Sequence, residues 1–476
     1  MTEESDRSPG GGGRSPSTDD RRSTNPLTPP VEPSDSRPRG DAPKTDLTPL
    51  VSVCLEADAD ALVVIGDRFD DDLRYLTRFS GPDRPFALVV VPGPTDRPAR
   101  AVLCAPALFS EQATREFVEA ARKPVDADAP DTTDAPDTTD APDTTDAPFH
   151  DGITRSVRTD GVGDPVGLRA AAVLDDLLPD PSDPTVLTPQ SIPHDAALHL
   201  DGAGYRLAST TAIADARAIK TDAEIDRLGR VQRATTRAMA RAETVLAEST
   251  PVYDPDALDS MALDEPVLVW NDAPLSTERL RRQVNVTLAR YGVRDAGNTV
   301  IGAGPSAADL HYTGVDLLRP GETVLLDISP RGPDGYYGDL TRTFVVDGDG
   351  GWERRAYVAV EAAREAALAT LEPGVTAREV HREAAAELAA YGFDPNAGEG
   401  EAGFTHGTGH GVGVSLHEAP SLSGDTELWP GHVVTVEPGV YNPDLGGVRL
   451  EDLVAVTDDG YSILASYPFR MVPERS

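Results

Sequence analysis

The sequence predicts an α+β protein in which a smaller α/β domain precedes a larger C-terminal domain. Three short apolar runs, at 62–65, 86–91 and 101–104, are each bounded by Gly, Pro or Asp, which is typical of buried strands. Helical spacing of apolar residues at 107–123 and 166–178 predicts the helices that accompany them. In the second half of the chain, by contrast, long helical patterns alternate with strands that run into carboxylates.

Composition divides the chain further. Residues 1–46 are rich in Pro, Gly, Ser, Asp and Arg and have almost nothing to bury, so a disordered tail is expected. Residues 126–148 repeat Asp-Ala-Pro-Asp-Thr-Thr and interrupt folded sequence, which is typical of a low-complexity surface-loop insertion. The predicted domains are therefore 47–207, which contains this insertion, and 208–476.

The C-terminal domain is expected to be rich in helix. Helices are predicted at 222–246, 276–291, 352–370 and 376–391. The last of them has Thr376 and Glu379 as a capping box, and Gly392 as its stop. The stretch 248–275 is rich in Pro and Asp and is predicted to be a loop excursion.

The formal net charge of the chain is −37, from 80 Asp and Glu against 43 Lys and Arg. Proteins bind nucleic acid and anionic membranes through Lys and Arg contacts to phosphate, so this surface is expected to repel both. No apolar run approaches the ~18 residues of a membrane span. Because the charge is spread along the chain, a surface suited to a salt-rich cytoplasm is favoured over the alternative, an acidic interaction protein.

Two cysteines, Cys54 and Cys104, both have apolar neighbours. They are too few for a disulfide framework and are predicted to be thiols in a protein core. The pair Arg21-Arg22 is not followed by an apolar segment, so no secretory signal is predicted. We expect a cytoplasmic protein in a reducing compartment.

Four carboxylates of the C-terminal half adjoin apolar strands. They are Asp327, Asp339, Glu437 and Glu451. Taking an isolated carboxylate out of water costs several kcal/mol, and converging carboxylates also repel one another. Salt bridges account for one such position, but Arg342 and Arg449 are too few to neutralise all four.

The same half of the chain also resembles itself. The segments "RPGETVLLDIS" (319–329) and "WPGHVVTVEPG" (429–439) share Pro-Gly, an apolar strand and then a carboxylate. A helical pattern and a histidine precede each strand, the histidines being His311 and His417. Two related half-domains that share one site would explain the repetition.

Bound cations would balance the carboxylates. Two divalent ions neutralise about four negative charges, and His410 of "THGTGHGVGVSLHE" (405–418) offers a neutral nitrogen. Carboxylates with one imidazole suit Mn²⁺, Co²⁺, Fe²⁺ or Zn²⁺. Two such ions, about 3.5–4 Å apart, lower the pKa of a bridging water and polarise a carbonyl, which is the chemistry of hydrolysis. His311 and His417 would then bind the developing oxyanion or transfer protons near pH 7.

Four motifs carry a resemblance to a known family. "DISPRGPDGYYGDLTRTF", "HGTGHGVGVSLHEAP", "TVEPGVY" and "GVRLEDL" resemble the motif series of the pita-bread metallopeptidases (M24), which include Xaa-Pro aminopeptidases, prolidases and methionine aminopeptidases. The resemblance covers about 215–470. Upstream, "DLRYLTRF" (72–79) resembles a signature of the amino-terminal domain of the Xaa-Pro-cleaving and creatinase branches.

The resemblance implies a pita-bread catalytic domain with pseudo-twofold half-domains after a creatinase-like N-terminal domain. It implies five metal ligands, Asp327, Asp339, His410, Glu437 and Glu451, with Asp339 and Glu451 bridging two ions. It also implies catalytic roles for His311 and His417 and supporting roles for His406 and Arg449. The expected activity is hydrolysis of Xaa-Pro bonds in short proline-containing peptides by a metal-bridging hydroxide. Mn²⁺ or Co²⁺ is favoured over Zn²⁺ or Fe²⁺, and a homodimer is expected.

Two departures from the family pattern accompany the resemblance. The spacing from Asp327 to Asp339 is one residue longer than usual, and the extra residue is expected to bulge at Pro333-Asp334-Gly335 without moving Asp339. The segment 248–275 also fits the family poorly. Two alternatives stay open: a creatinase-like or ectoine-type amidohydrolase on the same scaffold, and a non-enzymatic binding module. The sequence does not distinguish dipeptide from longer substrates.

Overall fold

The computed structural model describes residues 45–93, 97–122, 149–159, 163–178, 183–398 and 400–475. The insertion expected at 126–148 lies outside these residues, as does the tail expected at 1–46 apart from its last two positions. One of these two, Thr45, is buried, and its hydroxyl donates a hydrogen bond to the carbonyl of Tyr75. Ordered packing therefore begins before residue 47. No helix in the described ranges combines the length and the apolar character needed to cross a bilayer.

The N-terminal region contains a six-stranded mixed sheet with the strand order β4-β3-β2-β1-β5-β6. The strands are β1 (Ala61–Gly66), β2 (Phe86–Val91), β3 (Arg100–Cys104), β4 (Thr154–Arg158), β5 (Thr185–Pro189) and β6 (Arg206–Thr210). β2 pairs antiparallel with β1 and β3, and the other neighbours are parallel. The three strands predicted from apolar runs are confirmed as β1, β2 and β3. β6 ends at Thr210, beyond the domain boundary expected at residue 207.

Helices cover both faces of this sheet. They include α1 (Thr48–Glu56), α2 (Asp71–Thr77), α4 (Val166–Leu177) and α5 (His194–Gly202). Successive residues of a strand point to opposite faces, so Leu62 packs in the core that contains Cys54, whereas Val63 packs in the core that contains Cys104. Both cysteines are buried, which confirms their predicted place in the core.

The helix predicted at 107–123 is not regular. It consists of η1 (Ala107–Phe109), α3 (Ser110–Ala113), the π-helical turn η2 (Thr114–Val118) and η3 (Glu119–Ala121). The hydroxyl of Thr114 donates to the carbonyl of Ser110 at 2.9 Å, a side-chain contact that bends helices. Glu116 accepts a hydrogen bond from the amide of Ser80 at 2.8 Å, which draws this turn towards a neighbouring loop. The prediction of one continuous α-helix was therefore wrong.

The C-terminal region contains two larger antiparallel sheets. The first has the order β10 (Thr299–Ala303), β11 (Thr323–Ile328), β12 (Leu340–Val345). The second has the order β14 (Glu418–Ser421), β13 (His410–Gly411), β15 (Val433–Val436), β18 (Asp452–Thr457), β19 (Gly460–Ile463), with β16 (Gly439–Asn442) and β17 (Gly446–Arg449) as a separate hairpin. The two similar segments, 319–329 and 429–439, thus each supply one strand. The first supplies β11 to the first sheet, and the second supplies β15 to the second sheet.

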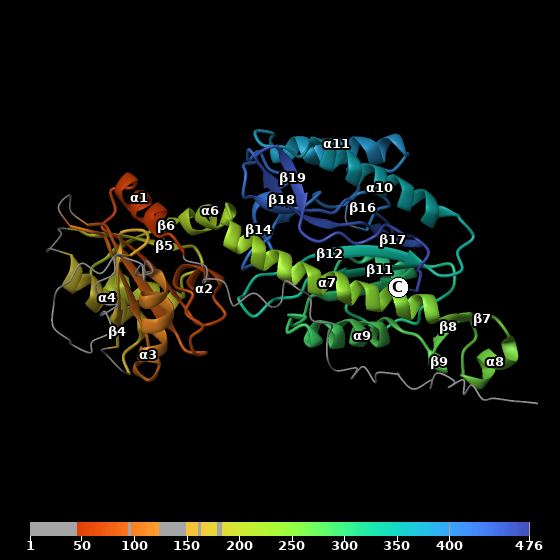
Figure 1. Cartoon of the computed structure of the whole chain (residues 1–476), viewed down its shortest axis with the longest axis horizontal. Helices are drawn as coiled ribbons and strands as arrows, with labels where there is room; N and C mark the ends of the chain where they lie inside the picture. The colour runs from red at the N-terminus through yellow and green to blue at the C-terminus, as the bar shows by residue number, and fades with distance from the viewer. Residues whose placement is uncertain are drawn as a thin grey trace, which may run out of the picture. The chain divides into compact units, whose positions relative to one another are not determined.

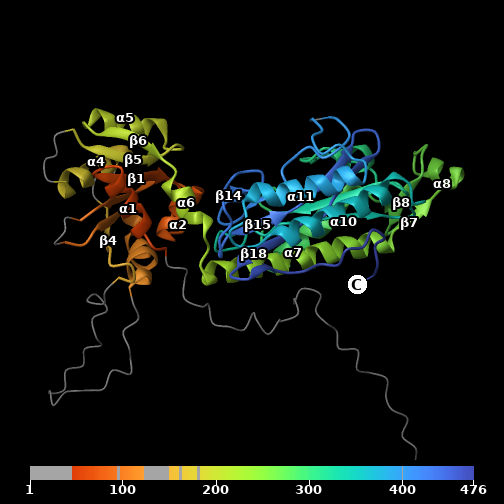
Figure 2. The ribbon, with the colours of Figure 1, turned by 90° about the horizontal axis from the view of Figure 1, so that it is seen from above.

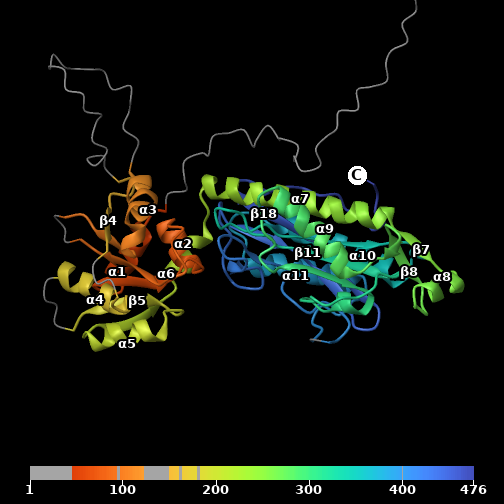
Figure 3. The same cartoon turned by 90° about the horizontal axis from the view of Figure 1, so that it is seen from below.

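A pair of helices packs on each of these sheets. The paired helices are α7 (Asp222–Glu248) with α9 (Thr277–Arg290), and α10 (Trp352–Thr370) with α11 (Ala377–Ala390). A shorter helix, α6 (Ala212–Ala218), precedes α7. α7 and α9 share a core with β10, β11 and β12 (Figure 1 and Figure 3). α10 and α11 lie side by side and share a core with β15 and β18 (Figure 2). The predicted helices are confirmed, as are the Thr376–Glu379 capping box and the left-handed Gly392 (φ +84°).

The long helix α7 is bound to distant parts of the chain at three levels. Near its start, Glu224 accepts a hydrogen bond from the hydroxyl of Tyr336 at 2.8 Å. In its middle, the side-chain amide of Gln232 donates to the backbone carbonyl of Asp339 at 2.6 Å, and its oxygen accepts from the backbone N–H of Asp339 at 2.8 Å. Towards its end, Glu243 accepts a hydrogen bond from the hydroxyl of Tyr467. One helix therefore holds both the connection between β11 and β12 and the segment that follows β19.

The segment 248–275 is structured, so its prediction as a loop excursion was wrong. It forms β7 (Thr250–Val252), the short helix α8 (Pro255–Ser260), β8 (Val267–Trp270) and β9 (Ala273–Pro274), and the three strands make a small sheet. Leu268 of β8 is fully buried, and the indole N–H of Trp270 donates to Glu248 at 3.1 Å. The four-residue strand β8 was hidden in the sequence by the Pro and Asp residues on either side of it.

Helix α2 contains most of the "DLRYLTRF" motif, whose charged side chains contact the C-terminal region. Asp72 accepts from Arg217 at 2.6 Å, and Asp71, which immediately precedes the motif, accepts from Arg331 at 2.6 Å. Arg78, which follows the helix, donates to the hydroxyl of Tyr336, also at 2.6 Å. The motif is therefore explained by contacts between the two regions.

Candidate metal centre

Three of the carboxylates expected from the sequence converge in the C-terminal region. Asp327 lies near the end of β11, Asp339 immediately before β12 and Glu451 immediately before β18. One carboxylate oxygen from each lies within 4.8 Å of the others. Asp339 and Glu451 are buried, with relative exposures of 4% and 2%. The antiparallel pairing of β11 with β12 brings the first two together, because Asp327 is opposite Thr341.

Glu437 and His410 complete the group from the second sheet. Glu437 follows β15, and its Oε1 lies 3.3 Å from Nε2 of His410, which is itself 3.9 Å from Oδ2 of Asp339. The other ring nitrogen of His410, Nδ1, lies 3.1 Å from the carbonyl of Gly411. That contact assigns the proton to Nδ1 and leaves the lone pair of Nε2 directed at the carboxylates. All five expected ligands thus meet in one place.

The glycines of the "HGTGHG" segment permit this approach. A Cβ built on Gly409 would lie 2.0 Å from the carbonyl oxygen of Thr435, and one on Gly411 would lie 2.3 Å from that of Ala419. Any side chain at these positions would push His410 away from the neighbouring strands. Close backbone packing is therefore a condition for placing the imidazole.

One cation only, among the residues that line the site, faces these acids. Arg449 donates to Oδ2 of Asp327 at 2.6 Å, and its Nε lies 3.8 Å from Oε2 of Glu437. Arg342, considered from the sequence as a second counter-charge, instead pairs with Asp452 at 2.8 Å. Four carboxylates against one guanidinium leave an excess of about three negative charges.

This excess appears in the pKa values of the buried acids. Burial, reinforced by repulsion from Asp327, raises the pKa of Asp339 well above its usual value. Burial also raises the pKa of Glu437 to about 7, despite the opposing effect of Arg449. The pKa of Glu451 is raised well above normal by burial and then by Asp339. The site is electrostatically unfavourable until further positive charge is added.

His311 and His417 line the same cavity, which has a volume of about 520 Å³. The ring of His417 lies 4.3 Å, centroid to centroid, from that of His410. Burial, followed by the nearby His410, lowers the pKa of His417, so its imidazole is neutral at physiological pH. His311 is exposed at the opening. Both rings are available to a molecule that enters the cavity.

His406 takes a supporting position. Its Nε2 lies 2.8 Å from the hydroxyl of Tyr441, and this hydroxyl accepts a hydrogen bond from Arg449 at 2.9 Å. Burial lowers the pKa of His406 to about 3, so the ring is neutral. The chain His406–Tyr441–Arg449 ends on Asp327 and orients that carboxylate.

Several residues that sequence reasoning missed orient the carboxylates. The hydroxyl of Ser329 donates to the carboxylate of Asp327 at 3.1 Å and to that of Asp339 at 2.9 Å. Thr341 donates to Glu451 at 2.7 Å, and Thr435 donates to Glu437 at 3.0 Å. Their position could have identified them from the sequence, because each hydroxyl residue lies two residues from a carboxylate or opposite one across a sheet.

The segment between Asp327 and Asp339 forms a hairpin, and the turn expected to hold an extra residue lies at its tip. Arg331 and Tyr337 form a bridge, and Gly335, with φ +94°, turns the chain between them. Pro333 and Asp334 are exposed at its tip. Asp339 keeps its place among the other carboxylates.

The donor set fits divalent cations. The buried acids carry an uncompensated charge, the imidazole presents a lone pair to them, and oxygen atoms from two sheets converge within a few ångströms. Oxygen ligands with one imidazole suit first-row divalent metals. The fold and the site together define a metalloprotein with a carboxylate–histidine centre between two half-domains.

Comparison with known sequences agrees. A sequence model of metallopeptidase family M24 matches residues 226–458, the segment that contains all five candidate ligands. The putative dipeptidase YkvY of Bacillus subtilis is 36% identical over 198 residues, which cover 41% of this chain and 52% of the relative. The Xaa-Pro dipeptidase of Pyrococcus furiosus is 36% identical over 170 residues, covering 35% of this chain and 47% of the relative. The matched stretches span about half the length of these relatives.

Solved structures share the fold over more of the chain. The prolidase from Pyrococcus horikoshii OT3 superposes with a TM-score of 0.66 at 20% identity and covers 90% of this chain and 99% of that one. The dipeptidase PepE from Mycobacterium ulcerans gives a TM-score of 0.65 at 24% identity, covering 90% and 96%. The pita-bread fold predicted from the sequence is thereby confirmed.

Proposed function

We propose that the protein is a metal-dependent peptidase that hydrolyses Xaa-Pro bonds of short peptides, as an Xaa-Pro aminopeptidase or a proline dipeptidase. The observation that carries this proposal is the meeting of Asp327, Asp339, His410, Glu437 and Glu451 in one cavity with two further histidines. The printed names of the sequence relatives, which include Xaa-Pro dipeptidases, support the choice of substrate.

The five side chains are the proposed ligands of two divalent ions, with Asp339 and Glu451 between them. Such ions, when bound, activate water and polarise a carbonyl. The role proposed for His417 is to hold the substrate carbonyl by a hydrogen bond from its neutral ring, which lies beside His410. The role proposed for His311, which lines the same cavity and is exposed, is to bind the developing oxyanion or to transfer protons. Arg449 and His406 would keep Asp327 oriented without touching substrate.

Further details are proposed on indirect grounds. Mn²⁺ or Co²⁺ is proposed from the family resemblance, with Zn²⁺ or Fe²⁺ as alternatives, since the donor set suits all four. Residues 47–207 would shape the exit side of the site, and 208–476 would be the catalytic domain. A homodimer, a salt-rich cytoplasm as the location, and the absence of nucleic-acid and membrane partners stay predictions from the sequence.

A direct assay tests the proposal. Purified protein in high salt with Mn²⁺ would be offered Xaa-Pro dipeptides, Xaa-Pro-Xaa tripeptides and ectoine, and a sample stripped by a chelator would be assayed in parallel. We expect hydrolysis of a proline substrate only in the metal-loaded sample, with recovery after Mn²⁺ or Co²⁺ is returned. Cleavage of ectoine alone would favour the amidohydrolase, and full activity without metal would contradict the mechanism.

A further inference from the structure

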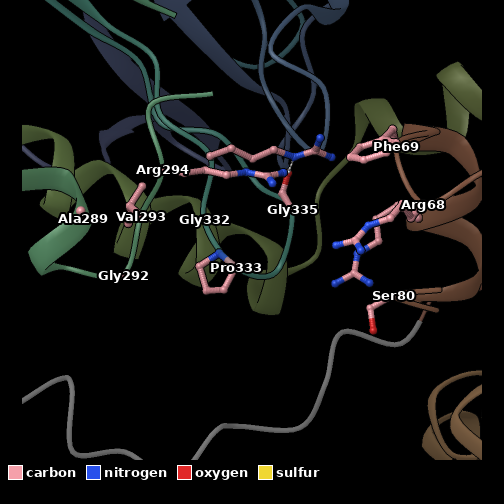
Figure 4. Close-up of a pocket in the computed structure, with 12 residues that line it drawn as sticks. Arg68, Phe69, Ser80, Ala289, Gly292, Val293, Arg294, Gly332, Pro333 and Gly335 are labelled. Atoms are coloured by element: carbon pink, nitrogen blue, oxygen red, sulfur yellow. Dashed lines mark hydrogen bonds between the residues drawn. The ribbon is translucent and has the colours of Figure 1, made fainter. Parts of the chain in front are cut away.

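A second cavity, with a volume of about 400 Å³, lies between α2 and the hairpin that joins β11 to β12 (Figure 4). Four arginines line it, Arg68 and Arg74 from the α2 side and Arg294 and Arg331 from the hairpin side. None of its lining residues lines the candidate metal centre. In a chain with a net charge of −37, a concentration of guanidinium groups is unexpected and calls for a reason.

The arginines of the hairpin side are held next to each other by the backbone. Arg294 and Arg331 exchange two backbone hydrogen bonds, of 3.1 and 2.8 Å, in an antiparallel bridge. Residues directly opposite in such a bridge project their side chains to the same face. Arg331 is further fixed because its Nε donates to the carbonyl of Gly335 at 2.8 Å. Figure 4 shows Arg294 and Arg68 on different walls of the cavity.

The acids around the cavity already have partners, and for Asp71 one of these is the lining residue Arg331. Asp71 pairs with Arg331 and also accepts from Ser415 at 2.6 Å. Asp334 lies near Arg227 and Arg230, at 3.6 and 3.7 Å. Glu116, which faces Arg74, accepts the amide of Ser80.

The remaining guanidinium groups lack such partners. Across the described ranges of the chain, neither Arg68 nor Arg294 has a carboxylate within salt-bridge distance, and both are exposed. Arg74 is half-buried and donates to the carbonyl of Arg78 at 3.3 Å. Burial, opposed by Glu116, lowers the pKa of Arg74, and the neighbouring Arg78 lowers it further, although arginine stays charged. Positive charge is thus the unsatisfied feature of this cavity.

Apolar groups line the rest of the cavity. Phe69 is 62% exposed, and Val293 and Pro333 complete the lining between the two arginine walls. Guanidinium groups match the planar or tetrahedral oxygens of carboxylates and phosphates through paired hydrogen bonds. A cavity of this size with apolar and cationic walls is suited to a small organic molecule rather than to a simple halide.

We propose that this cavity binds a small organic dianion, a phosphate monoester or a dicarboxylate, whose charged group is held by Arg68, Arg74 and Arg294 together with Arg331. The site extends the proposed peptidase function, because Arg331 belongs to the hairpin between Asp327 and Asp339 and also donates to the carbonyl of Val414 at 3.1 Å. The binding claim itself does not depend on which reaction the metal centre catalyses.

The test is calorimetric titration of the full-length, metal-loaded protein with glycerol 3-phosphate and with succinate. Each probe replaces sodium chloride at fixed ionic strength, since exposed charges are screened by salt. The double variant Arg68→Gln, Arg294→Gln removes two exposed cations without touching the metal centre. The matched control, Arg354→Gln with Arg382→Gln, removes two exposed arginines from α10 and α11.

We expect one probe or both to bind at a single site, and affinity to fall at least tenfold in the cavity variant but less than twofold in the control. Binding of glycerol 3-phosphate alone would assign the site to phosphate esters, and binding of succinate alone to dicarboxylates. The absence of binding by either probe at 50 mM, or an equal loss of affinity in both variants, would overturn the proposal. Circular dichroism spectra and urea unfolding curves that match those of the wild type serve as the check that both variants fold.

Discussion

His417 and Glu418 are neighbours in the sequence, but each lies at a different acidic cluster. The pKa values of the two clusters are shifted in opposite directions. His417 faces the site cluster, defined here as Asp327, Asp339, Glu437 and Glu451. Glu418 belongs to a paired cluster, in which it contacts Arg217 at 2.5 Å and Lys220 at 3.0 Å. Although burial opposes it, the two cations lower the pKa of Glu418, whereas burial and mutual repulsion raise those of Asp339 and Glu451.

The difference shows that a buried carboxylate is not by itself the mark of a metal site. Asp452 is as buried as Glu451, its neighbour in sequence, yet it pairs with both Arg342 and Arg364. What distinguishes the site cluster is the ratio of acids to cations, four to one, within one cavity. Stability should depend on the paired clusters, and activity on the site cluster.

The largest effect is expected at Asp339. Asp339→Asn removes a proposed bridging ligand and should lower kcat/KM for an Xaa-Pro substrate by at least about 10³-fold, with loss of bound metal. Because the substitution also relieves repulsion, the metal-free protein should be no less stable to urea than the wild type. Metal content measured by mass spectrometry, together with urea titration, checks both expectations. The exposed Asp334→Asn in the same hairpin is the control and should change neither.

His417→Ala is expected to come next. Removal of a group that binds or protonates the reacting substrate typically costs about 10²–10⁴-fold in kcat. Metal content should stay within error of the wild type, because His417 lies beside His410 without being a proposed ligand. Loss of metal in this variant would show that its assigned role is wrong.

Glu418→Gln probes the other side of the comparison. It leaves Lys220 buried without its carboxylate partner, and Arg217 with Asp72 alone, which should lower the free energy of unfolding by about 3 kcal/mol. Bound metal should be retained, so the loss would appear in urea titration and not in metal analysis. Glu427→Gln, an exposed change nearby, should cost less than about 0.5 kcal/mol. Equal stability of the two variants would remove the distinction between the clusters.

The smallest effect concerns His432, which lies near Lys220. Burial, followed by that lysine, lowers the pKa of His432 to about 4 in the folded state, against about 6.5 when unfolded. The unfolded chain therefore binds the proton more readily than the folded chain. The stability that depends on a neutral His432 is complete above pH 6.5 and is lost as the pH falls towards 4. We expect about 1–2 kcal/mol of the fall in stability between pH 6.5 and 4.5 to disappear in His432→Gln. A pH dependence of unfolding identical to that of the wild type would contradict this assignment.

Much of the site was predictable because its signals are local. Asp327 and Glu437 each end an apolar run, and His410 lies among closely spaced glycines, so a single stretch of sequence reveals each ligand. The partners that orient them were not predictable in this way. Gln232 reaches Asp339 across more than a hundred residues, and nothing near either residue announces the contact.

The fold shows the same division between local and distant information. Helices with caps, such as the one that begins after Thr376, were predicted nearly to the residue. The segment 248–275 was not, since its short strands are stabilised by each other and by Leu318, whose carbonyl accepts the amide of Leu268 at 2.8 Å. The helix at 107–123 was distorted by contacts to Ser80 that lie outside its own pattern.

The three attachments of α7 have a consequence for how this chain tolerates insertions. Glu224, Gln232 and Glu243 lie on a rigid rod, and the first and last are about 28 Å apart at 1.5 Å per residue. One residue added between them would turn everything beyond it by about 100°, so the contacts with Tyr336, Asp339 and Tyr467 could no longer all form at once. Length variation among related chains should therefore be absent from the middle of this helix and should gather in the connections at its two ends.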